Sequence, residues 1–174
     1  MNLLGKVIIL VVILVIVYYL WKWWASGRMD STYDMGGGPQ SAMQAFSQPT
    51  IPAADLGDMN GTAYSFSVWI LVQDWSYRIG EEKIIFTRAH ASPASGVTEA
   101  PKVSLDANTN DVHVTVTTQQ PNGVQGDETC SVSNIPIQTW VNIITVVNGR
   151  ALDVYIDGKL QRTCYLKGLP FLPT

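Results

Sequence analysis

Histidine and cysteine are scarce in this chain, with two of each among 174 residues. Two thiols cannot supply a four-ligand zinc site, and His90 and His113 do not stand at metal-ligand spacing from Cys130 or Cys164. The sequence therefore excludes a zinc-finger type of domain. For the cysteines, 34 positions apart, two interpretations stay open: a disulfide between neighbouring strands, or two small buried apolar side chains.

Basic residues are few beyond position 28. That part of the chain carries all 14 Asp and Glu but only 8 of the 11 Lys and Arg, a formal charge of −6. Such a surface repels phosphate backbones, and no basic stripe with interleaved aromatic residues is present. We therefore expect no nucleic-acid partner.

Charge is absent from the run Val7 to Trp21, and extending the run from Leu3 to Trp24 adds only two lysines. As a helix, this extended run would measure about 33 Å, enough to cross a hydrocarbon core of about 30 Å. Apolar residues lie on all its sides, and aromatic residues gather at its carboxyl end as in interfacial belts. We therefore predict a single-pass transmembrane anchor over residues 1–24, with these lipid-facing and interfacial side chains: Val7, Ile8, Leu10, Ile13, Leu14, Val17, Tyr18, Trp21, Trp23 and Trp24.

Two other interpretations of this run remain. A cleaved secretory signal would use the small residues at positions 25–27, although bulky Trp23 and Trp24 precede them. A buried helix of a soluble core is the other. The orientation of an anchor is undecided, because the amino terminus and Lys6 on one side oppose Lys22 and Arg28 on the other.

Residues 25–59 are rich in Gly, Ser and Pro and show little periodicity. Three glycines, 36–38, followed by Pro39 prevent a helix from continuing. We predict a tether, either a loose spacer or a segment that becomes ordered along a partner through Met35, Met43 and Phe46. Asn60 begins a lone glycosylation sequon, relevant only if the domain enters the secretory lumen.

From residue 60 onwards the hydrophobic pattern has a period of two. Alternate residues from Tyr64 to Val72 are apolar and share one face of a strand, while Trp69 lies on the other. Seven more runs of this kind follow, beginning at Lys83, Lys102, Asp111, Thr129, Trp140, Leu152 and Leu160. In the run from Asp111, the valines point inward and His113 points to solvent.

Turn residues predict the connections between these strands. Asn148-Gly149 and Asp157-Gly158 tolerate the positive φ of tight hairpins, so the last three strands form an antiparallel meander. Residues 93–101, bounded by prolines, read as a longer loop. The predicted fold class is all-β, an antiparallel β-sandwich of the jelly-roll kind over residues 60–174, preceded by one N-terminal transmembrane helix.

Three stretches resemble laminin G-like domains, which are concanavalin A-like jelly rolls. The stretch FSVWILV resembles their first long strand, IIFTR the second, and WVNIITVVNGRALDVYIDGKL, from Trp140, is the most specific match. The resemblance covers about residues 60–168. Such domains continue past the last hairpin with strands that return beside the first, whereas Pro170 and Pro173 are poor strand residues here. We expect a domain without its closing strands, because of truncation or because another chain supplies them.

The concanavalin A-like fold includes glucanases, whose paired carboxylates alternate along one strand so that they face the same sugar. This sequence offers no such pair. Glu81 and Glu82 are adjacent and would point to opposite faces, and Asp153 and Asp157 bracket a hairpin turn. We therefore expect a protein that is not an enzyme.

Binding residues are the remaining candidates. Asp106 and Asp111 could offer oxygen ligands to calcium, or could simply stabilise a polar loop by Asx turns. No other cofactor is expected. Trp75 and Tyr77 could stack on a sugar, or could cap the sandwich or contact a protein partner.

The layout of anchor, tether and laminin G-like domain resembles minor capsid proteins of large icosahedral double-stranded DNA viruses with an internal membrane, of the chlorella-virus type. The resemblance implies a non-enzymatic structural module located in a virion inner membrane beneath the capsid. Its partners would be the lipid bilayer and other capsid proteins, major and minor. The alternative is a membrane-anchored carbohydrate-binding, lectin-like or adhesion module with a glycan partner.

Overall fold

The computed structural model describes residues 3–26, 38–39, 41–43, 63–92, 96–121 and 123–171. The chain divides into two compact units, Met1–Asp58 and Met59–Thr174. Most of the predicted tether, including Met35 and Phe46, lies outside the described residues, as does the sequon at Asn60.

The first unit contains helix α1, Leu3–Ser26. Its side chains from Ile9 to Trp21 are each about half exposed, so the helix presents apolar surface all round. Six of the predicted anchor residues are among them: Leu10, Ile13, Leu14, Val17, Tyr18 and Trp21. Val7, Ile8, Trp23 and Trp24 lie in the helix, but their side chains fall outside the described part.

No helix in the described part of the chain is both long and apolar enough to cross a membrane. The structure therefore does not support the transmembrane anchor predicted for residues 1–24. It supports an N-terminal helix with an exposed apolar surface.

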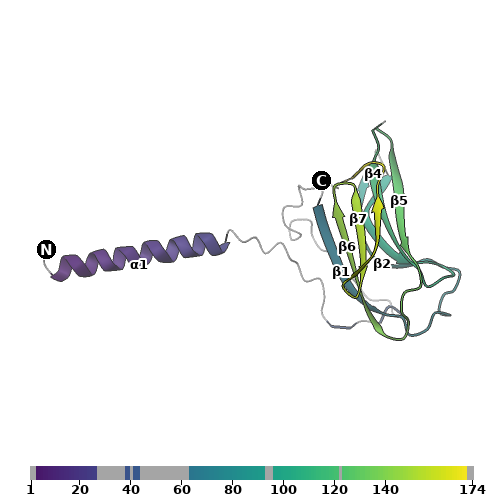
Figure 1. The fold of residues 1–174 in the computed structure, drawn as a ribbon, viewed down its shortest axis with the longest axis horizontal. Helices are drawn as coiled ribbons and strands as arrows, with labels where there is room; N and C mark the ends of the chain where they lie inside the picture. Colours follow the sequence, from purple (N-terminus) through teal and green to yellow (C-terminus); the bar gives the residue numbers. More distant parts are fainter. Residues whose placement is uncertain are drawn as a thin grey trace. The chain divides into compact units, whose positions relative to one another are not determined.

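The second unit is a sandwich of two antiparallel sheets that face each other (Figure 1). One sheet has the strand order β1-β6-β7-β8; the other has the order β2-β3-β4-β5, with β9 also paired to β4. The strands in its described residues are β1 (Ala63–Leu71), β2 (Lys83–Ser92), β3 (Gly96–Leu105), β4 (Val112–Gln119), β5 (Gln125–Val132), β6 (Trp140–Asn148), β7 (Ala151–Ile156), β8 (Lys159–Tyr165) and β9 (Leu169–Pro170).

The core lies between the two sheets and confirms the predicted alternation. Val112, Val114 and Val116 of β4 are fully buried, as are Leu152 and Val154 of β7. Burying one such side chain contributes roughly 1.5–3 kcal/mol to folding. Every residue of the buried cluster falls between positions 64 and 166, so the second unit contains its own core.

The β6-β7-β8 meander is confirmed. Gly149 has a φ of 57° in the first hairpin turn, and Asp157 and Gly158 have φ values of 49° and 74° in the second. Positive φ at these positions gives the turn the twist of the strands it joins. The second dipeptide does what its sequence predicts, whereas in the first only Gly149 takes a positive φ and Asn148 ends strand β6.

The loop predicted over residues 93–101 is wrong, because β3 already begins at Gly96. Pro101 fits within β3 since it stands where the β2-β3 ladder shifts register, opposite Arg88. Proline is tolerated at such irregularities because no ladder N–H is needed there.

The end of the chain also departs from the prediction, because Pro170 belongs to strand β9 and pairs with Thr118. The N–H of Phe171 extends the contact by donating to the carbonyl of Thr117 at 2.8 Å. Gly168 allows this close approach. A Cβ at this position would lie 2.4 Å from the carbonyl oxygen of Gln119.

Cys130 of β5 and Cys164 of β8 form a disulfide with a Cα–Cα distance of 5.9 Å. The bond joins edge strands of the two facing sheets. Of the two interpretations left open for these cysteines, the structure has the bonded one.

Candidate functional site

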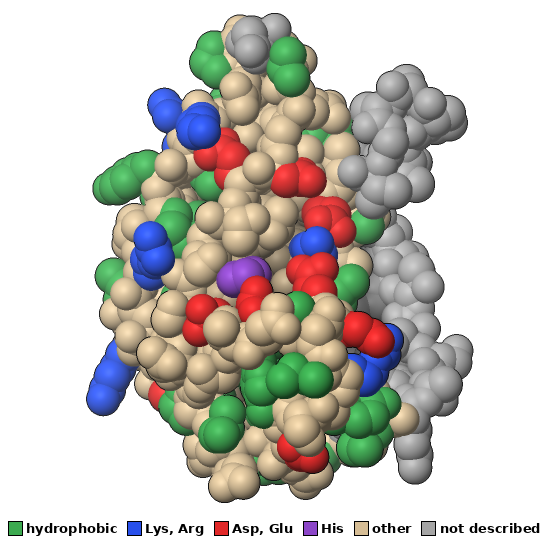
Figure 2. Space-filling view, turned by 90° about the vertical axis from the view of Figure 1, so that its right-hand side faces the viewer, with side chains coloured by type: hydrophobic (Ala, Val, Ile, Leu, Met, Phe, Trp, Pro, Cys, Tyr) green, Lys and Arg blue, Asp and Glu red, His purple; other side chains and the backbone are tan. Residues whose placement is uncertain are grey.

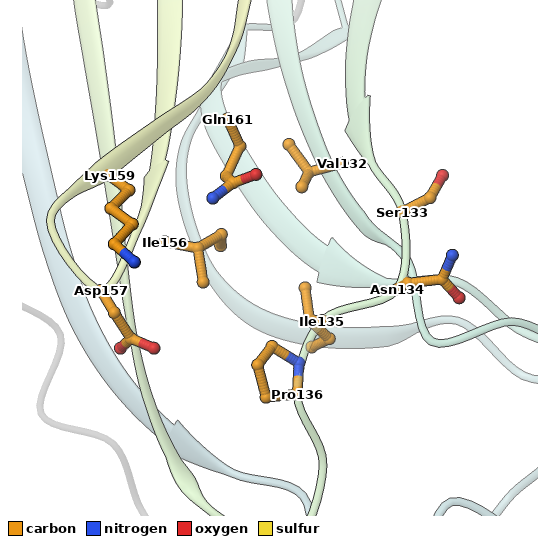
Figure 3. Close-up of a pocket in the computed structure, with 9 residues that line it drawn as sticks. All are labelled: Val132, Ser133, Asn134, Ile135, Pro136, Ile156, Asp157, Lys159 and Gln161. Atoms are coloured by element: carbon orange, nitrogen blue, oxygen red, sulfur yellow. The ribbon is translucent and has the colours of Figure 1, made fainter.

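A pocket of about 260 Å³ opens at one end of the sandwich, between the loop that follows β5 and the β7-β8 hairpin (Figure 3). Its floor is aliphatic: Val132, Ile135 and Ile156 are 8%, 2% and 6% exposed. Its rim is polar and carries Ser133, Asn134, Asp157, Lys159 and Gln161. The lining residues include no aromatic side chain.

Hydrogen bonds fix the loop side of the pocket. The carboxylate of Asp111 accepts from the Ser133 hydroxyl at 3.3 Å and from the Asn134 N–H at 3.1 Å. Ile135 donates its N–H to the carbonyl of Asn110, and its own carbonyl accepts from the Asn110 side chain, both at 3.0 Å. The loop is therefore held in place before any ligand arrives.

The hairpin side is fixed in the same way. Asp157 donates its N–H to the carbonyl of Asn142, and its carboxylate accepts from the Asn142 N–H, both at 2.9 Å. The pocket thus lies between two anchored walls.

Asp106 holds a loop of its own. Its Oδ1 accepts from the N–H groups of Asn108 and Thr109 at 2.8 and 2.9 Å, and these hydrogen bonds lower its pKa to about 2. The described residues contain no group of three or more His, Cys, Asp or Glu that could hold a metal ion. Asp106 stabilises its own loop by an Asx turn, one of the two interpretations of the sequence, while Asp111 anchors the loop that follows β5. Calcium binding by Asp106 and Asp111 stays a prediction.

The outer face of the β2-β3-β4-β5 sheet is polar, and Figure 2 shows acidic, basic and histidine side chains gathered on it. Lys102 Nζ lies 3.5 Å from a Glu82 carboxylate oxygen and 3.3 Å from one of Glu99. The Ser104 hydroxyl donates to Glu82 at 2.6 Å, and this bond, ahead of the charge of Lys102, lowers the pKa of Glu82. We call this surface the polar face.

Threonines extend the same network along β4. The Thr117 hydroxyl donates to Asp127 at 2.6 Å and accepts from the Glu99 N–H at 2.8 Å. Thr115 and Thr129 share a hydrogen bond of 2.9 Å. The polar groups of the polar face are thus largely occupied by one another.

The outer face of the β1-β6-β7-β8 sheet is apolar at one end. Trp69, Trp140 and Leu160 are 62%, 46% and 53% exposed. Trp69 and Trp140 are diagonal neighbours, because Trp69 pairs with Asn142 and Leu71 with Trp140. Ile144, Tyr155 and Leu160 form a row across three strands, because Tyr155 stands opposite both of the others. We call the surface of these residues, Trp69, Leu71, Trp140, Ile144, Tyr155 and Leu160, the apolar face.

Trp75 and Tyr77, proposed from the sequence as contact residues, differ in exposure. Trp75 is partly buried against the core, and Lys83 Nζ lies 5.2 Å from the centroid of its ring. Tyr77 is 40% exposed. The capping role is therefore the one that fits Trp75, while Tyr77 remains accessible.

Sequence reasoning did not select Trp69 and Trp140 as contact residues. For Trp69 the sequence pattern does contain an indication, because this residue falls on the outward side of its strand, out of phase with the alternating core residues. Their adjacency depends on pairing between β1 and β6, strands about 70 positions apart along the chain.

A sequence profile of the concanavalin A-like lectin/glucanases superfamily, of the laminin G type, matches residues 46–172. A comparison with curated proteins found no match.

Proposed function

We propose that this chain, which belongs to the concanavalin A-like lectin/glucanase superfamily, is a non-catalytic module that binds a protein partner through its apolar face. The fold alone does not decide between lectin, enzyme and scaffold. The observation that carries the proposal is the exposure of Trp69, Trp140 and Leu160 together on one sheet surface. Exposed clusters of large apolar side chains commonly mark sites of protein contact.

A glycan is the second candidate for this face, because an exposed tryptophan can stack on a sugar ring. Sugar hydroxyls also need hydrogen-bonding groups beside that ring. One polar group on this face, the Asn142 side-chain amide, already donates to the Ser67 hydroxyl at 3.0 Å and to the Val68 carbonyl at 3.3 Å. This occupation favours an apolar protein surface over a glycan.

Absence of catalysis is part of the proposal. Glycoside hydrolysis needs one carboxylic acid whose pKa is raised, so that it donates a proton. The carboxyl groups of this domain with shifted pKa values, Asp74, Glu82, Asp106 and Glu128, have them lowered. Each of these groups favours the charged form, which accepts protons poorly and donates none.

The finer role, a minor capsid protein located beneath a capsid shell, stays a prediction from resemblance. Within the proposal, capsid proteins are the partner class for the apolar face. A lipid bilayer is the second partner, because contact with lipid would remove the exposed apolar surface of α1 from water. Flotation with lipid vesicles tests the second partner: the full chain should float, and residues 59–174 should remain at the bottom of the gradient.

Proximity labelling in the cell that makes the protein tests the apolar face. The full chain is compared with the double variant Trp69→Thr/Trp140→Thr, and with Tyr77→Thr as a matched control that removes an exposed aromatic elsewhere. We expect a set of labelled proteins that the double variant loses and the control keeps.

Identical labelling by all three chains would overturn the proposal. Binding to a glycan array that is lost in the double variant would instead establish the second candidate. Release of reducing sugar from a β-glucan, abolished by Glu82→Gln, would contradict the non-catalytic part.

A further inference from the structure

The pocket of Figure 3 is smaller than a typical small-molecule site. Its volume of about 260 Å³ lies below the range of roughly 300–1,000 Å³ that small-molecule sites occupy. Its buried floor of Val132, Ile135 and Ile156 offers only aliphatic contact. A leucine, isoleucine or valine side chain matches both properties.

An open strand edge borders this pocket. In the order β1-β6-β7-β8, β8 is the last strand of its sheet, so one side of its backbone has no ladder partner among the residues that the structure describes. Lys159 and Gln161 of β8 both line the pocket. Edge strands bind extended peptides by main-chain pairing, and a pocket beside the edge selects one side chain of the added strand.

The charge of this edge indicates the kind of peptide. Strand β8 carries Lys159 and Arg162 and no carboxylate, in a chain whose net charge is −3. Lys159 is exposed and takes part in none of the ion pairs among the described residues. An extended segment with Asp or Glu beside its aliphatic residue would complement this basic edge.

We propose that β8 and its adjoining pocket form a second binding site, which takes an extended acidic segment of a partner protein. The segment pairs with the free edge of β8 and inserts one aliphatic side chain between Ile135 and Ile156. The anchored walls of the pocket lower the cost of binding, since neither the loop nor the hairpin has to be ordered first. The site shares Leu160 of β8 with the apolar face but does not use Trp69 or Trp140.

A phage-displayed library of random seven-residue peptides, panned against the full chain, tests this site. We expect enriched peptides to carry one aliphatic residue flanked by Asp or Glu. On addition of the best synthetic peptide, hydrogen exchange measured by mass spectrometry should slow in residues 159–165. The variant Lys159→Glu should weaken peptide binding at least tenfold, whereas Lys83→Glu, the same charge change on the other sheet, should leave it unchanged.

Three results would overturn the proposal. One is the absence of enriched peptides, or enrichment of basic ones. The second is slowed exchange in a different strand, which would place the peptide elsewhere. The third is concentration-dependent protection of residues 159–165 without any peptide, which would make a second copy of the chain the occupant. The double variant Trp69→Thr/Trp140→Thr should bind the peptide normally, so failure of this site and failure of the apolar face are distinguishable.

Discussion

The two outer faces of the sandwich use their side chains in opposite ways. On the polar face, Glu82 binds Lys102 and Ser104, and Thr117 binds Asp127 and the Glu99 N–H, so these groups are occupied within the domain. On the apolar face, Trp69 and its neighbours remain open to solvent. The difference teaches that the chemically richer face is the less available one. A charged surface suggests a binding site, yet in this domain the apolar face has more side-chain surface free to contact a partner.

Among the variants that test this comparison, we expect the largest loss of stability from the one that removes the covalent link between the two sheets. The double variant Cys130→Ser/Cys164→Ser removes the bond between β5 and β8. Closing a loop of about 34 residues in the unfolded chain is worth about 4 kcal/mol on the chain-entropy account. The free energy of unfolding, measured by denaturant titration, should fall by about that amount, and wild-type protein in reductant should match the variant. A loss below about 1 kcal/mol would show that the sheets hold together without the bond.

The second largest loss of stability is expected from a substitution on the polar face. Thr117 is 4% exposed and both accepts from the Glu99 N–H and donates to Asp127. Thr117→Val keeps the shape but leaves that N–H and carboxylate without their partner, which should cost roughly 1–3 kcal/mol in the free energy of unfolding. Denaturant titration measures it. An unchanged midpoint would mean that the polar network contributes nothing to stability.

A smaller effect on stability is expected from the apolar face. Trp69→Thr/Trp140→Thr replaces exposed side chains with a strand-favouring residue, so the free energy of unfolding should change by less than about 1 kcal/mol. The same titration provides the test. If this variant costs more than Thr117→Val, the contrast between the faces is wrong, because the tryptophans would then be structural.

The smallest effect is a pH dependence at the border of the polar face, where His113 Nε2 lies 3.9 Å from Asp106. Hydrogen bonds from Asn108 and Thr109 lower the pKa of Asp106 from 3.8 to about 2. The unfolded state therefore takes up this proton first, so the stabilisation is present above about pH 4 and is lost as the pH falls towards 2. Thermal melts of Asp106→Asn should show a flatter loss of Tm than wild type over this window. Parallel curves would contradict the assignment.

Local patterns predicted the parts of the fold that depend on neighbours in sequence. The inward valines of β4 and the turns at Gly149 and Gly158 follow from alternation and from glycine's tolerance of positive φ. Prolines misled the prediction at β3 and β9. Pro101 sits at a register shift and Pro170 in a two-residue strand, and both situations are set by the partner strand rather than by the proline.

The candidate sites depend on contacts that the sequence pattern does not encode. The pocket brings together Asn134 and Lys159, and the apolar face brings together Trp69 and Trp140. Neither site can therefore be predicted until the order of strands in the sheets is known. Asp111 illustrates the same limit. Its partners Ser133 and Asn134 follow it by more than 20 positions, so a loop anchor resembles a metal ligand until the fold is known.

The disulfide has a consequence for how the domain withstands proteases. All nine residues that line the pocket fall between Cys130 and Cys164, inside the covalent ring that the bond closes. A single cut anywhere in that ring, for example in the exposed loop at Ile137, leaves both products attached. A nicked chain would therefore migrate intact on a non-reducing gel, and two fragments would separate only after reduction.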